Sequence, residues 1–143
     1  MGMQNARIDI SENLEGETVV YACFDLREDE VAAAAHAIAA TSSERYRLAT
    51  MSGDDVLEFR ELTALGDELA EPGEGMRTIV LSPARICALR DAAGLFVETR
   101  LDADWIRDED REPLELLRML LGPLGELCEE ATRAALSPEQ YRH

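Results

Sequence analysis

The chain of 143 residues has no lysine, and all fourteen of its basic side chains are arginine. An arginine side chain stays protonated in proteins, so it cannot supply the free amine that a Schiff base requires. The absence of lysine therefore excludes pyridoxal-phosphate enzymes, lysine nucleophiles and the phosphate-binding loop that carries a lysine. Together with the frequent alanine and leucine, it indicates a GC-rich coding sequence of the bacterial kind.

Cysteine is scarce, and long apolar runs are missing. The three cysteines, Cys23, Cys87 and Cys128, are far apart and match no metal-binding or redox spacing. The N-terminal residues lack the basic and then apolar pattern of a signal peptide, and no run approaches the roughly 18 apolar residues of a membrane span. We therefore expect a cytoplasmic protein with reduced thiols, no membrane contact and no cofactor.

Acidic residues outnumber basic ones by thirty to fourteen, which gives a formal net charge of −16. Such a charge repels nucleic acids and anionic membranes, and it attracts basic surfaces. An acidic surface can also serve solubility alone. The apolar content of 46% is ordinary for a folded protein, and the length suits a single domain with residues 1–75 and 76–143 as its two parts.

Three segments share one pattern: an apolar, β-branched run, then a capping side chain, then the apolar spacing of a helix. The predicted strands are Thr18–Phe24, Tyr46–Met51 and Arg77–Leu81. The predicted caps are Asp25, with Glu28 as its capping-box partner, Ser52, and Ser82, which is followed by a first-turn Pro83. The first helix is expected to end near Ala40. A further alternating run, Arg7–Ile10, is expected to pair with Val19–Phe24 as a hairpin.

Two helices near the C-terminus are predicted to form a hairpin. The first keeps its helical spacing through Gly94; the alternative is a helix end at Gly94 and a strand over Leu95–Leu101. The second should bend or break at Gly122-Pro123 and end at Ser137-Pro138. It carries an apolar stripe with alternating spacings of three and four residues: Leu114, Leu117, Leu121, Leu124, Cys128, Ala131 and Ala135.

Leu120 and Leu127 widen this stripe beyond what one facing helix usually covers. The stripe itself is expected to pack on the preceding helix of the same chain. The surplus leucine surface, at Leu120, Leu124 and Leu127, predicts an interface between two copies, because a two-fold axis pairs like surfaces. The sequence therefore predicts a homodimer.

Two groups of acidic residues resemble metal sites. If the three strand-to-helix turns lie side by side, Asp25, Asp54 and Asp55 would meet there and could bind Mg²⁺. Helix capping and the helix dipole favour the same residues without a metal. Asp102, Asp104, Asp108 and Asp110 resemble a calcium loop, but Arg107 stands where that loop needs glycine, so a solvated connector around Trp105 is the better interpretation.

His36 and Cys23 are the remaining residues with chemical potential. His36 could act as a general base beside a carboxylate, but its place in an alanine-rich helix favours a histidine at the edge of the core. Cys23 lies within the run VVYACF and is expected to be a small buried hydrophobe. No local motif supports a pair between Cys23 and His36.

The sequence thus predicts an α+β fold, with a small sheet of three or four strands, covering helices and a C-terminal helical hairpin. A compact α/β fold with a parallel sheet is the alternative. For function, it favours a non-enzymatic interaction or regulatory protein that binds a basic protein partner and no nucleic acid. The alternative is a Mg²⁺-dependent enzyme that uses the carboxylates of Asp25, Asp54 and Asp55.

Overall fold

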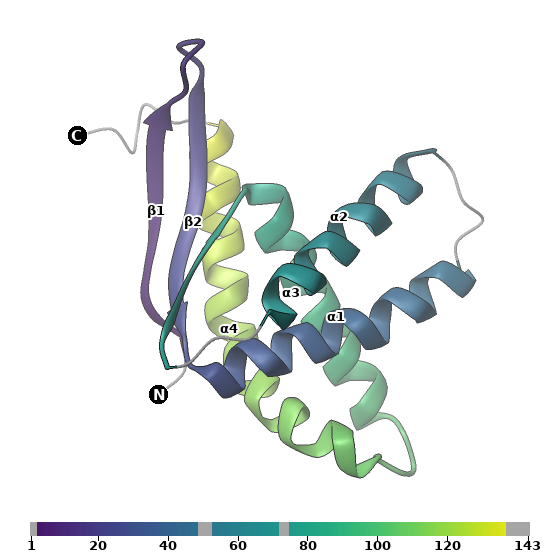
Figure 1. Cartoon of the computed structure of the whole chain (residues 1–143). Coiled ribbons are helices and arrows are strands. Elements are labelled where there is room, and N and C mark those ends of the chain that lie inside the picture. Colours follow the sequence, from purple (N-terminus) through teal and green to yellow (C-terminus); the bar gives the residue numbers. More distant parts are fainter. Residues whose placement is uncertain (1–2, 49–52, 72–74, 137–143) are drawn as a thin grey trace.

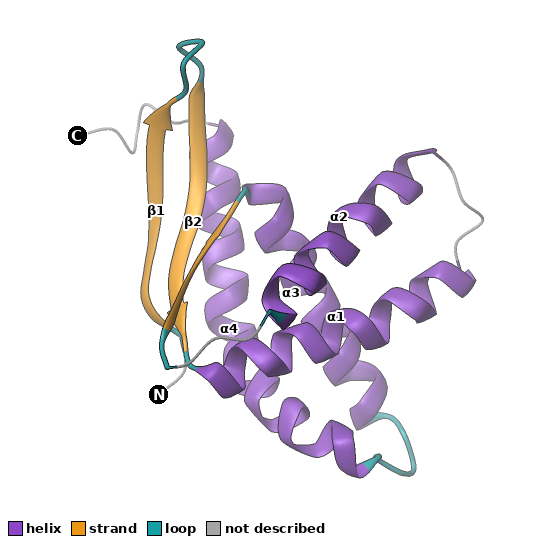
Figure 2. Ribbon diagram, in the orientation of Figure 1, coloured by secondary structure: helices purple, strands orange, loops and turns teal. Residues whose placement is uncertain are grey.

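Three antiparallel strands form one sheet in the order β1-β2-β3 in the part of the chain that the structure describes. The structure is a computed structural model and describes residues 3–48, 53–71 and 75–136. Four helices accompany the sheet in these residues, which confirms the predicted α+β fold and excludes the parallel sheet (Figures 1 and 2). The elements are β1 (Gln4–Glu12), β2 (Thr18–Leu26), α1 (Glu28–Leu48), α2 (Gly53–Ala70), β3 (Arg77–Leu81), α3 (Pro83–Leu101) and α4 (Asp108–Leu136).

The predicted N-terminal hairpin is confirmed as β1 and β2. Its turn depends on Asn13, whose side-chain oxygen accepts from the backbone N–H groups of Glu15 and Glu17 at 3.0 and 2.9 Å. Gly16 has φ +78, a conformation that residues with a Cβ rarely adopt. On one face of the hairpin, Val20 and Ala22 are buried, so the alternating apolar pattern places this face toward the core.

Asp25 is not a helix cap, contrary to the sequence prediction. Strand β2 continues to Leu26, because its ladder with β3 extends to the pair Leu26 and Arg77. Asp25 instead accepts hydrogen bonds from the Thr78 hydroxyl at 2.6 Å and the Asn5 amide at 2.7 Å. These two bonds, that of Thr78 first, lower the pKa of the Asp25 carboxyl. Asp25 therefore joins all three strands of the sheet.

The capping box of α1 lies two residues later than predicted. The buried side chain of Glu30 accepts from the backbone N–H of Arg27 at 2.8 Å and so satisfies a donor that the helix leaves free. The Arg27 guanidinium also contacts the same carboxylate, at 3.3 Å. The pairing is therefore Arg27 with Glu30, in place of Asp25 with Glu28.

The predicted strand Tyr46–Met51 is wrong where the structure describes it, because α1 continues through Leu48. The run of small polar residues after Ala40 does not end the helix. Thr41 is buried, and its hydroxyl donates to the carbonyl of Ala37 at 2.8 Å, so the hydroxyl is satisfied within the helix. The predicted Ser52 cap lies outside the described residues.

Helices α1 and α2 pack as neighbours and project away from the sheet (Figure 1). Their close approach depends on Gly66 of α2, where an added Cβ would lie 2.8 Å from the Cγ2 atom of Ile38 on α1. Helix α3 contacts both α1 and α4, and it also contacts α2 and β2. It therefore connects the helical pair to the layer behind the sheet.

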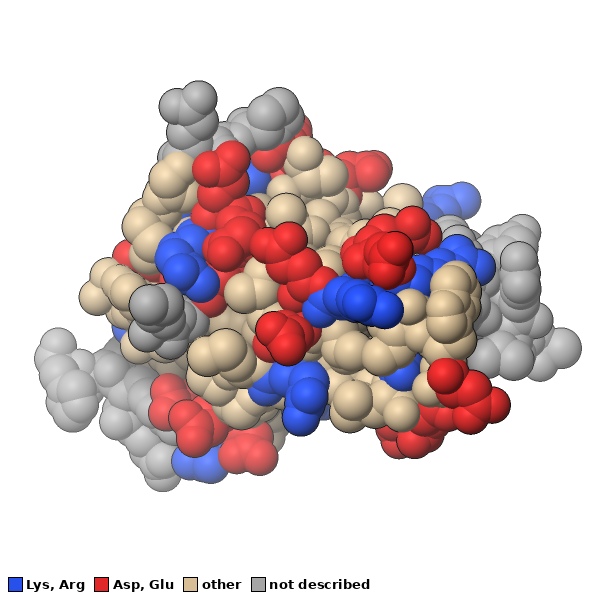
Figure 3. Space-filling view, turned by 90° about the horizontal axis from the view of Figure 1, so that it is seen from below, with Lys and Arg blue, Asp and Glu red and all other residues tan. Residues whose placement is uncertain are grey.

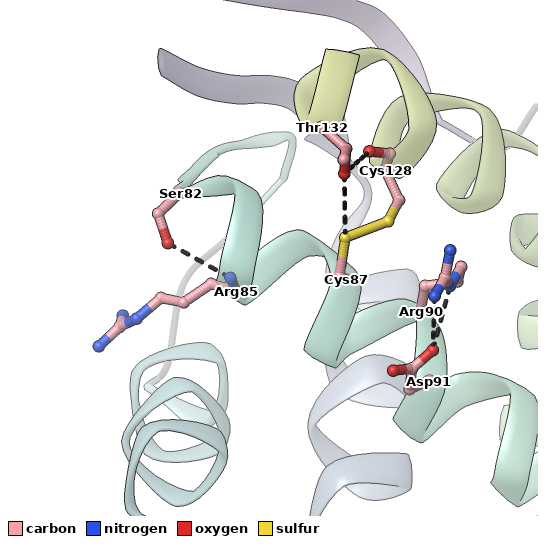
Figure 4. The surroundings of a disulfide bond; sticks show 7 residues. All are labelled: Ser82, Arg85, Cys87, Arg90, Asp91, Cys128 and Thr132. Carbon is pink, nitrogen blue, oxygen red and sulfur yellow. Dashed lines mark hydrogen bonds and ion pairs between the residues drawn. A yellow bond between two sulfur atoms is a disulfide. The ribbon is translucent and has the colours of Figure 1, made fainter. Parts of the chain in front are cut away.

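Helix α3 confirms two sequence predictions. Ser82 caps it, with its hydroxyl accepting from the Arg85 N–H at 3.3 Å, and Pro83 occupies the first turn (Figure 4). The helix runs through Gly94 to Leu101, so Leu95–Leu101 is helix and not strand. The acidic connector around Trp105 separates α3 from α4.

Helix α4 packs on α3, as predicted, and also contacts α1, β1 and β2. Figure 1 shows it changing direction between its first and last turns, and the helix is unbroken across Gly122-Pro123, so a bend and not a break accommodates the proline. At the C-terminal end of the stripe, Ala134 is buried and the predicted Ala135 is exposed.

Leu120, Leu124 and Leu127 are not surplus surface. Their exposures are 1%, 1% and 2% within a single chain, because α4 has neighbours on several sides and a wide stripe can be buried against all of them. These leucines therefore offer no surface to a second copy, and their predicted role as interface residues is wrong. The predicted homodimer is therefore left without assigned interface residues.

A disulfide joins Cys87 of α3 to Cys128 of α4, which corrects the expectation that all thiols are reduced (Figure 4). The two Cα atoms are 5.3 Å apart. The Thr132 hydroxyl lies 3.7 Å from the Cys87 sulfur and donates to the carbonyl of Cys128 at 2.8 Å. Cys23 is free and buried, as predicted, and burial raises the pKa of its thiol.

Among the described residues, no helix combines the length and the apolar character that crossing a membrane would require.

Two neighbours on α4 test whether the leucine stripe is core. We expect Leu120→Glu to abolish cooperative folding, because it places a charge where only 1% of the side chain meets solvent, at a cost above about 4 kcal/mol. Met119→Glu should leave the melting temperature nearly unchanged, since Met119 is 63% exposed. Thermal melts followed by circular dichroism compare the two, and a folded Leu120→Glu protein would contradict the assignment.

The disulfide should stabilise the fold. Cys87 and Cys128 are 41 residues apart, and closing a loop of this length restricts the unfolded chain by about 4 kcal/mol in the entropic model. The Cys87→Ser/Cys128→Ser variant should therefore unfold at lower urea concentration than the oxidised protein. Adding a phosphine reductant should shift the wild type and leave the double variant unmoved. Equal midpoints for the oxidised wild type and the variant would rule out a stabilising role.

Candidate functional site

A groove of about 900 Å³ lies where the first turns of α1 and α4 come together beside Met76. Five carboxylate residues line it from the two helices. They are Glu28 and Asp29 on α1, and Asp108, Glu109 and Glu112 on α4. Each helix is acidic in its first turn, where the helix dipole favours negative charge. The groove is therefore acidic because two helix N-termini meet at it.

The lining between the carboxylates is apolar. Ala32 and Ala33 of α1 lie across from Pro113 and Leu116 of α4, and Met76 borders the same space. A second hollow of about 500 Å³ shares Glu28, Ala32, His36 and Met76 with the first and extends to Leu69 and Arg77. The shared residues make the two hollows one continuous groove along α1.

Arginines compensate part of the acidic rim. Arg27 lies 3.6 Å from Asp29, Arg111 lies 3.5 Å from Asp108, and Arg107 lies 3.7 Å from Glu109. Such exposed pairs are worth at most about 1 kcal/mol. Glu28 and Glu112 form no ion pair with any residue that the structure describes. Figure 3, a view from the side of the first turns of α4, shows carboxylates spread across this face with arginines between them.

His36 borders both parts of the groove and is bonded to a buried carboxylate. Its Nε2 atom lies 2.6 Å from an oxygen of Asp110, and Arg100 of α3 lies 3.5 Å from the other oxygen. The edge of the imidazole meets Phe96, with 5.6 Å between the ring centroids, and the Arg100 guanidinium lies 4.7 Å from the centroid of the same phenyl ring. The side chain of His36 is 34% exposed, which confirms a histidine at the edge of the core.

Asp110 is ionised in this setting. Burial acts to raise the pKa of its carboxyl, but the hydrogen bond from His36 and the charge of Arg100 outweigh it, so the pKa lies below its usual value. An ionised carboxylate can only accept hydrogen bonds, so the proton between the two groups belongs to Nε2 of His36. The pair therefore presents an imidazole of fixed orientation at the wall of the groove.

Of the three residues predicted for Mg²⁺, the structure describes the side chain of Asp25 alone. Asp25 lies within the sheet and bonds to Thr78 and Asn5, and the side chains of Asp54 and Asp55 lie outside the described residues. The prediction also depended on three strand-to-helix turns lying side by side, and the second predicted strand, Tyr46–Met51, is helical up to Leu48. Among the side chains that are described, no group of three or more histidine, cysteine, aspartate or glutamate residues could hold a metal.

The calcium-loop resemblance also fails at one of its positions, because Asp110 is buried and bonds to His36 and Arg100.

The sequence pattern points to His36 and not to its partner. Asp110 stands among the aspartates of the acidic connector, and it is 74 residues from His36. No periodic pattern relates two residues so far apart on different helices. The one available signal was that Asp110 precedes Leu114 by four residues, which places it on the buried face of α4.

Asp110→Asn should lower stability at neutral pH by roughly 1–3 kcal/mol, because the charge-assisted bonds of a nearly buried group are lost. The pKa of the Asp110 carboxyl is lower in the folded protein than its unfolded value of about 3.9. The stability that the ionised carboxylate contributes is therefore present above that unfolded pKa and is lost as the pH falls through the folded pKa. Urea unfolding of the variant and the wild type should therefore differ at pH 7 and converge in acid. Exposed Asp104→Asn is the control, and a constant difference down to pH 2 would contradict the ionised pair.

Comparisons of the chain with models of protein families, with curated proteins and with solved structures find no match.

Proposed function

We propose that the protein is a non-enzymatic binding protein whose acidic groove takes up a basic segment of a partner protein. The observation that supports this most is the joint lining of the groove, in which carboxylates from two helices surround an apolar surface. A simple counter-ion would need only the charges. A segment that carries both arginine or lysine and apolar side chains would use the charges and the apolar lining together.

The size of the groove suits a peptide segment. Glu28 and His36 are eight residues apart on α1, which is about 12 Å along a helix axis. Asp108 and Leu116 mark a similar length on α4. A span of this length corresponds to about four residues of an extended chain. Several side chains of one partner segment can therefore contact the groove at once.

Charge supports the proposal at longer range. The formal net charge of −16 attracts a basic partner and speeds its encounter. Trp105, which is 72% exposed in the connector before α4, adds an aromatic face three residues from Asp108. Guanidinium groups pack favourably on such faces. These features favour a partner rich in arginine.

A cytoplasmic location and a homodimer are proposed from the sequence. The Cys87–Cys128 disulfide weighs against a cytoplasmic location, because cytoplasmic thiols are usually kept reduced. The homodimer has no assigned interface residues, since Leu120, Leu124 and Leu127 are buried within one chain. The binding proposal depends on neither of them.

Fluorescence anisotropy of a labelled peptide that alternates arginine and leucine tests the binding. We expect saturable binding that weakens steeply with salt, and no binding of the peptide in which citrulline replaces arginine, because citrulline keeps the shape and removes the charge. Glu28→Gln/Glu112→Gln should weaken binding about fivefold or more, since both carboxylates lack an arginine partner among the described residues.

The matched control is Glu126→Gln/Glu130→Gln, which removes the same charge from exposed positions on α4 that do not line the groove. It should change the affinity less than twofold. An equal loss in both double variants would mean that net charge alone attracts the peptide, and the groove proposal would then be abandoned.

A further inference from the structure

The hydrogen bond between His36 and the buried Asp110 determines which ring nitrogen of this groove residue carries a proton. Because Asp110 is an ionised acceptor, Nε2 of His36 carries the proton of their 2.6 Å bond. In the neutral ring, Nδ1 is then the only remaining nitrogen and holds a lone pair. Nδ1 forms no hydrogen bond with any residue that the structure describes.

The imidazole is accessible from the groove. Glu28, Ala32 and His36 follow one another at intervals of four residues, so they share one face of α1, and all three line both parts of the groove. The small Ala32 leaves the space between the carboxylate and the imidazole unfilled by a long side chain. A cationic group held near Glu28 can therefore extend along α1 to His36.

We propose that neutral His36 accepts a hydrogen bond at Nδ1 from an ammonium or guanidinium group of the bound segment, and that protonation of the ring expels this group. The proposal rests on the basic-segment function and adds a proton-controlled contact to it. When the ring takes up a proton, Nδ1 becomes a donor and the site gains a positive charge. Both changes oppose a cationic ligand.

Charged groups on every element around His36 determine how strong this control is. The α3 guanidinium of Arg100 offsets the charge of Asp110, so the immediate surroundings of the imidazole are close to neutral before the ring titrates. A proton on His36 therefore makes these immediate surroundings positive. The other charged groups that line the groove near it are Arg27, Glu28 and Asp29 at the start of α1, Asp108, Glu109 and Glu112 of α4, Glu71 after α2, and Arg77 of β3.

Protonation of His36 must lower the affinity for the cation by the same factor by which the bound cation lowers the affinity of His36 for a proton. If the cation binds only the neutral ring, its affinity falls about tenfold for each pH unit below the titration midpoint of the imidazole. Carboxylates ordinarily titrate near pH 4, so they stay ionised above about pH 5.5 and do not contribute to this change. Reciprocally, a saturating cation should lower the titration midpoint of His36.

The first experiment measures the affinity of the arginine–leucine peptide by anisotropy between pH 5.5 and 8. We expect the affinity of the wild type to fall toward the acidic end. His36→Gln should bind with an affinity independent of pH, because glutamine keeps a donor for Asp110 and does not titrate. His143→Gln, which removes the only other histidine, should keep the wild-type pH dependence. Wild-type affinity that does not change with pH, or an equal slope in His36→Gln, would overturn the proposal.

A second experiment follows the His36 ring proton by NMR during a pH titration, with and without arginine amide. The His36→Gln spectrum assigns the signal. A lower midpoint with arginine amide supports the proposal, and an unchanged midpoint overturns it. Peptide binding at pH 8 whose affinity does not change with pH would support the basic-segment function and overturn the role of His36. A shifted midpoint without peptide binding would support a contact between His36 and a cation and overturn the basic-segment function.

Discussion

Burial of the apolar stripe of α4 is the interaction on which the rest of the structure depends. The helix contacts β1, β2, α1 and α3, so its leucines form the shared core of the sheet layer and the helical layer. Each leucine removed from water contributes roughly 2 kcal/mol. The stripe is wide because several elements pack around one helix. That width, which suggested a second copy of the chain, is used within a single copy.

The packing of α4 against α1 and α3 also forms the groove. Seating the stripe of α4 on α1 and α3 places the first turn of α4 beside the first turn of α1, and both turns are acidic. Two positive dipole ends then lie near each other, and the carboxylates of Glu28, Asp29, Asp108 and Glu109 offset that repulsion. Helix stability and ligand attraction thus favour the same residues. Two acids of these turns are buried instead: Asp110 bonds to His36 and Arg100, and Glu30 accepts from Arg27.

The local patterns of the sequence were sufficient to predict most of the elements. Alternation predicted the hairpin of β1 and β2, the Ser82-Pro83 pair predicted the start of α3, and unbroken spacing predicted a helix through Gly94. The errors arose where a local preference competed with a distant partner. Asp25 is a good capping residue in isolation, but the β2–β3 ladder extends past it. Threonine is neutral to unfavourable inside helices, but here the Thr41 hydroxyl bonds to a carbonyl within α1.

The site was less predictable than the fold because each of its essential pairings joins distant residues. His36 and Asp110 are 74 residues apart, and Cys87 and Cys128 are 41 apart. No spacing rule connects either pair, since each forms only when α4 is seated against its neighbours. The acidic character of the groove was implicit in the net charge. Its position was not, because that depends on which two helix N-termini meet.

The arginines at the rim impose a final constraint on any ligand. A basic segment must compete with Arg27, Arg107 and Arg111 for carboxylates that these residues already contact. Each exposed pair is worth at most about 1 kcal/mol, so displacing it costs little, but the net gain from exchanging one guanidinium for another is also small. At these three paired carboxylates, the ligand's charge therefore speeds and orients the encounter without adding much affinity, whereas Glu28 and Glu112, which have no arginine partner among the described residues, gain a new ion pair. Burial against Ala32, Met76 and Leu116 must supply the remainder, so a partner has to be apolar as well as basic.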